Sequence, residues 1–511
     1  MNIVVSMQWE GEPILCQSVR ARGRGHGQRA RAWPKRLPCQ NRQQIIDTIY
    51  DAAWQYLLSY VHRDGEPMHR ASLSTSVNQH YLNKLMNLTE VMDVAASEDI
   101  VDVRGMKLVA KGARLTRAQQ HTLGRHKLKK TLESSLSAEG GADNRLILET
   151  ATRILDTSVP INRILGRNAG RGISPQTLLA NMQFGHAMRM MLTLTDRDHP
   201  RALEHSVAVS LLSIGMAKKL QLSNDEQMAA ALAGLLHDIG ELYIDPAYLK
   251  PGKRLLPHEW AHLVIHPRIG QVLITELESY PASVARAVSE HHERLDGTGY
   301  PRQSAGGMIS GPGLAVSVAE MLAGVLHKDY PLERAELALK IIPGEHPHHF
   351  LSAISGALRN QPANRPIAPS RPDENDDAAI ARLWSRIADS LQAGQDMLSE
   401  DTARSPRVWA LIERALARIR NIERAFISTG LDAYLKNNHG LHDNDDGTLQ
   451  FEKAVATREI TWRLRDIARD LALNTADLAS DRDMLAGLID LLDDGPSDAA
   501  VPQAQPQARA A

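Results

Sequence analysis

The sequence has little cysteine, almost no net charge and no long apolar run. Its two cysteines, Cys16 and Cys39, both lie near the start of the 511 residues, so a disulfide framework is excluded for the body of the protein, which favours a reducing cytoplasm. A formal net charge of −1 excludes the basic footprint of a nucleic-acid binder, and we expect no DNA partner. No apolar run reaches about 18 residues, and residues 1–16 have no basic start, so neither a membrane span nor a signal peptide is expected.

What is present indicates a globular chain of several domains. Hydrophobic residues make up 43% and charged residues 23%, and the length requires roughly two to four domains. We expect a mostly α-helical protein. Its expected parts are a disordered basic extension (1–40), a small α+β accessory module (41–140), an all-helical domain (145–360), a proline-rich linker (361–372), a helical bundle (373–495) and a disordered tail (496–511).

Local patterns support these divisions. Residues 17–40 are rich in arginine and poor in apolar side chains, which predicts disorder; a polybasic arm for nucleic acid or anionic lipid is the alternative. A helical pattern begins at Arg42. Residues 99–112 are β-branched and punctuated by glycine, which predicts a hairpin, and residues 117–136 read as a helix. Apolar residues at helical spacing resume after the linker and predict the bundle.

The pair His237-Asp238 is the first candidate site. It follows residues 228–236, whose small and apolar side chains are typical of a buried helix. A buried, unpaired aspartate beside a histidine is unfavourable, and metal ligation would remove the penalty. A capping aspartate beside a core histidine is the alternative interpretation.

Two further groups of histidines have metal-ligand spacing. His258, His262 and His266 are four residues apart and share a helix face, so each of them could bind a metal on spacing alone. His291 and His292 are adjacent, and neighbours on a helix point about 100° apart, so they can serve different ions. Phosphodiester hydrolysis at neutral pH fits such a set, because two ions activate a water and relieve the phosphate charge.

The stretches Leu236–Gly240, Ile265–Gly270 and His291–Pro301 together resemble the HD-GYP family, bacterial metal-dependent phosphodiesterases that open cyclic di-GMP. The resemblance covers roughly residues 185–345 and implies an all-helical HD-type catalytic domain. The implied metal ligands are His205, His237, Asp238, His266, His291, His292 and Glu320, with His237 and Asp238 catalytic and Asp238 bridging. The implied substrate contacts are Lys250, Lys253, Arg294, Asp296, Gly297, Gly299, Tyr300 and Pro301.

Three positions depart from the family pattern. The family lysine that contacts substrate phosphate is replaced by Glu241, which is an unfavourable exchange of charge. Lys250 and Lys253 could compensate for it, and Arg294 is another nearby cation. A further acidic ligand of the family is replaced by Arg201, which cannot bind a metal, so a two-metal site is favoured. After the last carboxylate, residues 328–331 match the family's cationic motif only in part.

The expected function is hydrolysis of cyclic di-GMP to linear pGpG, with GMP left open as a further product. Two divalent ions are expected, iron or manganese first, with zinc or nickel as alternatives. A catalytically degenerate signalling scaffold and a phosphohydrolase for another nucleotide are the competing hypotheses. A homodimer and a protein partner bound through the C-terminal helices also fit the sequence.

Overall fold

The computed structural model describes most of the chain after residue 76. The described residues are 2–8, 15–22, 77–165, 174–199, 201–250, 253, 255, 257–327, 331–340, 344–359, 376–399, 406–428, 447–475 and 479–493. The helix predicted from Arg42, the linker 361–372 and the tail 496–511 lie outside them. The chain divides into two compact units, residues 1–71 and 72–511. In the described residues, no helix is long and apolar enough to cross a membrane.

In the first unit, β1 (Asn2–Gln8) pairs antiparallel with β2 (Leu15–Arg22). The remainder of the predicted extension 1–40 lies outside the described residues, so its disorder stays a prediction.

The second unit begins with a small α+β module. Its elements are α2 (Gln79–Leu88), β3 (Val94–Ala96), β4 (Ile100–Val101), β5 (Lys107–Val109), α3 (Arg117–Arg125), η1 (Glu133–Ser135) and β6 (Leu136–Ala138). Strand β4 pairs with β5 and β3 pairs with β6, both antiparallel. The hairpin predicted within residues 99–112 is therefore confirmed.

The helix predicted over residues 117–136 is wrong beyond Arg125. The backbone after α3 pairs with the hairpin instead, where Lys127 O accepts from Val103 N and Lys129 N donates to Val101 O, each at 2.9 Å. Tertiary hydrogen bonding here overrides the helical preference of a lysine-rich segment.

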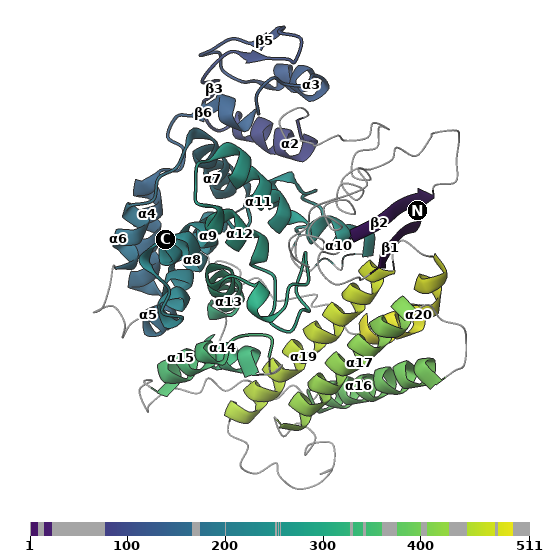
Figure 1. Cartoon of the computed structure of the whole chain (residues 1–511). Coiled ribbons are helices and arrows are strands. Elements are labelled where there is room, and N and C mark those ends of the chain that lie inside the picture. The colour runs from purple at the N-terminus through teal and green to yellow at the C-terminus, as the bar shows by residue number, and fades with distance from the viewer. Residues whose placement is uncertain are drawn as a thin grey trace, which may run out of the picture. The chain divides into compact units, whose positions relative to one another are not determined.

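An all-helical region follows, as predicted for residues 145–360. Its elements are α4 (Asn144–Thr157), α5 (Val159–Leu165), α6 (Pro175–Ala180), α7 (His186–Asp198), α8 (Ala202–Lys219), α9 (Asn224–Leu236), η2 (Ile239–Tyr243), α10 (Pro257–Leu263), α11 (His266–Leu277), α12 (Ala282–Glu290), η3 (Gly306–Met308), α13 (Gly311–Leu326), α14 (Pro331–Lys340) and α15 (His348–Arg359). Helices α8, α9, α12 and α13 pack together and are drawn in teal in Figure 1.

Small residues let the central helices approach closely. A Cβ at Gly234 of α9 would lie 2.9 Å from Ser210 Cα of α8, which leaves room only for glycine. The Ser210 hydroxyl donates to Ala231 O at 2.7 Å, so the buried polar group is satisfied. Helix α9 begins at a capping box of Ser223 and Glu226, which fixes its start. The positions of the functional side chains at its far end follow from this packing.

The C-terminal helices are α16 (Asp376–Ser399), α17 (Pro406–Ser428), α19 (Gly447–Asn474) and α20 (Ala479–Asp493). They bury their own apolar cluster, which includes Ile387, Ile419 and Leu464 and is separate from the cluster that runs from Tyr81 to Ala357. The predicted fold class, mostly helical with a small α+β module and a C-terminal bundle, is confirmed.

Candidate metal centre

Seven side chains that the family resemblance implied as ligands meet in one place. His237 and His291 are the residues at which α9 and α12 end, and His266 follows α10 and begins α11. His205 lies in the first turn of α8, and Glu320 lies in the middle of α13. Five elements therefore supply the site, and the packing of their helices fixes its geometry.

The first ligand group consists of His205, His237, Asp238 and Glu320. Nε2 of His205 lies 3.0 Å from Oε2 of Glu320, and Nε2 of His237 lies 3.1 Å from the same oxygen. Oδ2 of Asp238 lies 2.9 Å from His237 Nε2. Two imidazoles and two carboxylates thus converge, a donor set that suits a divalent transition metal.

The second ligand group consists of Asp238, His266, His291 and His292, each of which offers one donor atom within 4.8 Å of the others. Nε2 of His266 lies 3.1 Å from Nε2 of His291. Oδ1 of Asp238 lies 3.4 Å from His266 Nε2 and 3.6 Å from His291 Nε2. Asp238 is common to both groups and turns one oxygen to each, which is the geometry of a bridging carboxylate.

Three of the histidines are oriented by the same contact. Nδ1 of His237, His266 and His291 lies 2.9, 2.8 and 2.6 Å from the carbonyl oxygen of the residue three positions earlier. A carbonyl only accepts, so each Nδ1 carries the proton and each neutral ring keeps a lone pair on Nε2, which faces the centre. This arrangement is common among metal-ligating histidines.

The site fits divalent ions better than it fits protons alone. With both Nδ1 atoms protonated, the Nε2 lone pairs of His266 and His291 face each other across 3.1 Å, a contact that an intervening cation would relieve. His237 Nε2 and Glu320 Oε2 are buried and have no hydrogen bond of good geometry among the described residues. Helices α9 and α12 also end at the ligand groups, and the negative C-terminal ends of their dipoles favour bound cations.

The charges of the centre are strongly coupled. Burial opposes the charged form of His237, but Asp238 and Glu320 outweigh it and raise its pKa well above the usual value. Burial and the neighbouring His291 lower the pKa of His292 well below its usual value. The two carboxylates therefore favour positive charge at the centre, whereas His292 stays neutral and can act as a metal ligand.

The turn after His292 is held by a buried carboxylate and by ring stacking. Glu293 accepts from the backbone N–H groups of Arg302 at 2.7 Å and Ser304 at 2.9 Å. The Tyr300 ring stacks on His292 with centroids 4.5 Å apart. Gly297 has φ +77°, and a Cβ at Gly299 would lie 2.4 Å from His292 O. Asp296 accepts from Thr298, and Pro301 follows Tyr300 through a cis bond.

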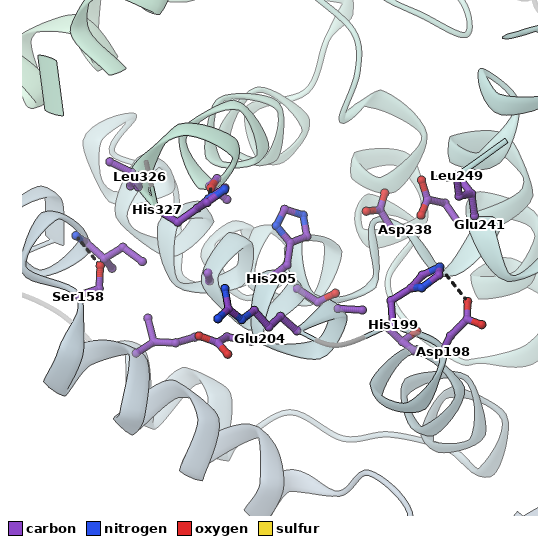
Figure 2. A pocket seen from close by; sticks show the side chains of 18 of the residues that line it. Ser158, Asp198, His199, Glu204, His205, Asp238, Glu241, Leu249, Leu326 and His327 are labelled. Atoms are coloured by element: carbon purple, nitrogen blue, oxygen red, sulfur yellow. Dashed lines mark hydrogen bonds and ion pairs between the residues drawn. The ribbon is translucent and has the colours of Figure 1, made fainter. Parts of the chain in front are cut away.

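A cavity of about 830 Å³ opens beside the first ligand group. Figure 2 shows His205, Asp238 and Glu241 among the side chains that line it. Its volume lies within the range of small-ligand sites. Burial first, and then the charge of Asp238, raises the pKa of Glu241 to about 7. Arg201 is the one arginine or lysine among the described residues that line the cavity.

The predicted substrate cations have different surroundings. Lys250 is exposed, whereas Lys253 pairs with Glu259 at 2.8 Å. Arg294 donates to Asp466 of α19 at 2.8 Å and lies 3.8 Å from Glu345, with its side chain only 12% exposed. The geometry therefore does not favour a phosphate contact for Arg294. His262 lies against Tyr248 and outside both ligand groups, which supports His266 rather than His262 as the metal ligand.

Sequence reasoning missed the acids that hold this region from outside. Asp466 and Glu345 are buried and lie 172 and 51 positions from Arg294 in the chain. No local sequence motif predicts that they contact it. Glu290 is also buried and accepts from Ser310 N at 2.9 Å, which links the end of α12 to the start of α13. The burial and the partners of these acids follow from tertiary contacts and could not be predicted from the neighbouring sequence.

Comparison with known proteins gives the class of this region. A family model described as an HD domain matches residues 189–350. The cyclic di-GMP phosphodiesterase PA4108 of Pseudomonas aeruginosa is 44% identical over 98 residues, 19% of this chain and 23% of that protein. The 3′3′-cGAMP-specific phosphodiesterase 3 of Vibrio cholerae is 36% identical over 118 residues, 23% of this chain and 25% of that protein. The cyclic di-GMP phosphodiesterase response regulator RpfG of Xanthomonas campestris is 36% identical over 113 residues, 22% and 30% of the two chains.

Residues 189–350 are therefore an HD domain. The relatives named above are cyclic-dinucleotide phosphodiesterases, two of them of cyclic di-GMP, so the family resemblance of this region is confirmed. The chain spans about a quarter of the length of the curated relatives that it matches.

Proposed function

We propose that the HD domain is a metal-dependent phosphodiesterase that hydrolyses cyclic di-GMP to linear pGpG, in bacterial second-messenger signalling. Further cleavage to GMP is left open. The observation that carries the proposal is the double ligand group that shares Asp238 beside the cavity of about 830 Å³. Similarity to phosphodiesterases of cyclic di-GMP supports the choice of substrate.

The residues have distinct roles in this proposal. His205, His237 and Glu320 hold one ion, His266, His291 and His292 hold the other, and Asp238 bridges them. Iron or manganese fits this mixture of imidazole and carboxylate, with zinc or nickel as alternatives. Two such ions would lower the pKa of a bound water and neutralise phosphate charge.

Contacts to the substrate are assigned to the turn after His292, to two lysines and to the arginine that lines the cavity. The turn Asp296–Pro301 borders the second ligand group, where Gly297 and Gly299 keep the backbone free of side chains and Tyr300 offers a ring face. Lys250 and Lys253 are proposed for the phosphates and offset Glu241, although Lys253 must then leave Glu259. Arg201 adds a cation that lines the cavity.

A second substrate has specific support. Some relatives are named as 3′3′-cGAMP-specific phosphodiesterases, and the metal chemistry is the same for any cyclic dinucleotide. Glu241, which adds negative charge to the cavity, is the feature that favours the third hypothesis, a catalytically degenerate scaffold. The retained ligand set argues against degeneration.

The test compares the wild-type chain and Asp238→Ala in hydrolysis of cyclic di-GMP and of 3′3′-cGAMP, with bound metal measured on the same samples. Loss of the bridge should remove both metal and turnover, because each ion loses a ligand. The matched control is Asp225→Ala, an exposed aspartate in the first turn of α9, which should keep both. Turnover that persists in Asp238→Ala would contradict the proposal. If the wild type hydrolyses only 3′3′-cGAMP, that dinucleotide replaces cyclic di-GMP as the proposed substrate.

A further inference from the structure

The outer side of the turn after His292 is attached to α19 of the C-terminal bundle. Arg294 donates to Asp466 at 2.8 Å, and the two side chains are 12% and 9% exposed. Arg418 of α17 donates to the same carboxylate oxygen at 2.7 Å. Asp466 is thus a buried acceptor between two guanidinium groups, one from the HD domain and one from the bundle.

A second anchor lies one helical turn further along α19. Gln303, at the end of the turn, donates to Asp470 at 2.7 Å, and Arg414 contacts Gln303 at 3.2 Å and Asp470 at 3.1 Å. Asp466 and Asp470 are four residues apart and so share a helix face. Both ends of segment 294–303 are therefore fastened to one face of α19.

Aromatic contacts continue from the ligands to the same helix. Tyr300 stacks on His292 and meets the Trp260 ring edge-on at 5.7 Å between centroids. Arg469 of α19 lies 4.7 Å from the centre of the Trp260 ring. The metal-facing and bundle-facing sides of the segment are thus joined by rings in contact as well as by ion pairs.

We propose that Asp466 is a positioning residue for the metal centre: by holding Arg294 it fixes segment 294–303, which directly follows the ligands His291 and His292 in the chain. This inference rests on the proposed function of the centre as a metal site. The bundle has its own apolar cluster, and the contacts named here between it and segment 294–303 are polar: an ion pair at Arg294 and a hydrogen bond from Gln303 to a carboxylate. Replacement of the carboxylate by an amide removes the negative charge between two buried cations, and the segment then loses its fixed geometry.

The test is Asp466→Asn in the full-length chain, with three readouts. Metal affinity, measured by chelator competition with manganese, should fall about tenfold or more, the range typical for groups that hold ligands in place. In steady-state hydrolysis of cyclic di-GMP, kcat should fall by more than KM rises. Amide hydrogen exchange should speed up in segment 293–303 and stay unchanged in α8 and α9.

Three further variants keep the test decisive. Asp490→Asn, an exposed aspartate of α20, is the matched control and should resemble the wild type in all readouts. Asp466→Glu keeps the charge and should recover most of the loss. In Arg294→Gln with Asp466→Asn, the losses should not add, because both substitutions break one contact. If Asp466→Asn fails to fold, Arg294→Lys replaces it, with the same expected direction.

Unchanged metal affinity and unchanged exchange in segment 293–303 of a folded Asp466→Asn chain would overturn the inference. A lowered melting temperature with normal metal affinity would also overturn it, because the role of Asp466 would then be only structural. If the wild type binds manganese but cleaves no cyclic dinucleotide, the proposed activity fails while the affinity and exchange readouts still decide the role of Asp466.

Discussion

At the scale of single residues, the centre depends on side chains whose donor atoms are oriented by neighbouring groups of the chain. Asp238 turns one oxygen to each ligand group, and three histidines are fixed by carbonyls three positions earlier. The motifs of the sequence identified these residues, because metal chemistry requires imidazole and carboxylate together. They indicated Arg294 as a substrate contact but did not reveal its partner Asp466, which is distant in the chain.

The Glu320 carboxylate should be required for binding of one ion but not of the other. In Glu320→Gln, bound metal should fall from about two ions to about one per chain, because His266, His291, His292 and Asp238 keep the second group intact. Elemental analysis after gel filtration measures this ratio. Retention of both ions, or loss of both, would contradict two ligand groups of separate composition.

Glu241 should make substrate binding depend on pH. Its pKa is raised to about 7, so the carboxyl is neutral below that pH and becomes an anion above it. The KM for cyclic di-GMP should therefore rise as the pH is raised from about 6 to about 8, and it should stay flat in Glu241→Gln. A screened contact of about 1 kcal/mol corresponds to about fivefold in KM.

The control for this pH dependence is Glu204→Gln. Its carboxylate lines the same cavity but pairs with Arg153 at 3.6 Å. This variant should keep the wild-type profile. An identical rise of KM in Glu241→Gln would show that another group is responsible.

At the scale of elements, His237, His266 and His291 lie where helices end, because a helix terminus leaves carbonyls free to orient an imidazole. The sequence predicted that His237 follows a buried helix, because small and apolar side chains fill residues 228–236, and α9 does end there. It placed His258, His262 and His266 on one helix face, whereas α10 ends at Leu263 and His266 begins α11. The prediction of a helix over residues 117–136 failed beyond Arg125, where hydrogen bonds to the hairpin replace the helix. Local sequence signals predict a helix correctly when its own apolar residues mark it as buried. They fail where hydrogen bonds to a distant strand determine the backbone conformation.

Gly240 should be required for the packing of η2 against α11. A Cβ there would lie 2.1 Å from His266 O, so Gly240→Ala forces two ligand-bearing elements apart. The variant should lose about 1–3 kcal/mol of unfolding free energy and bind metal more weakly. Gly324→Ala is the matched control, because its Cβ meets nothing within 4 Å in α13; it should be neutral or stabilising by about 1 kcal/mol. Equal behaviour of the two variants in urea unfolding would contradict this account.

At the scale of the whole molecule, the parts outside the HD domain contact the elements that carry ligands. Tyr243 of η2 stacks on Tyr81 of the α+β module, with centroids 5.1 Å apart, and donates to the buried Glu133. Composition predicted a module, a domain and a bundle, but it could not reveal these contacts, which join distant segments. The predicted domain limits, a homodimer and a protein partner of the bundle stay predictions.

The Tyr243 hydroxyl should stabilise the contact between the module and the domain. Tyr243→Phe keeps the stacked ring but leaves the buried Glu133 without this donor, so unfolding free energy should fall by about 1–3 kcal/mol. Chemical denaturation measures the loss, and metal content should not change. Tyr248→Phe, which removes a hydroxyl for which no hydrogen bond is found among the described residues, should have no effect on stability. A loss below about 0.5 kcal/mol in Tyr243→Phe would contradict the role of the hydroxyl.

The central claim is that one HD domain holds two ions and uses them to open a cyclic dinucleotide. The most direct test quantifies bound metal and turnover of cyclic di-GMP in the same preparation of the full chain, loaded with iron or with manganese. The account predicts about two ions per chain together with formation of linear pGpG. A chain that binds no metal and forms no product would contradict it and favour a signalling scaffold.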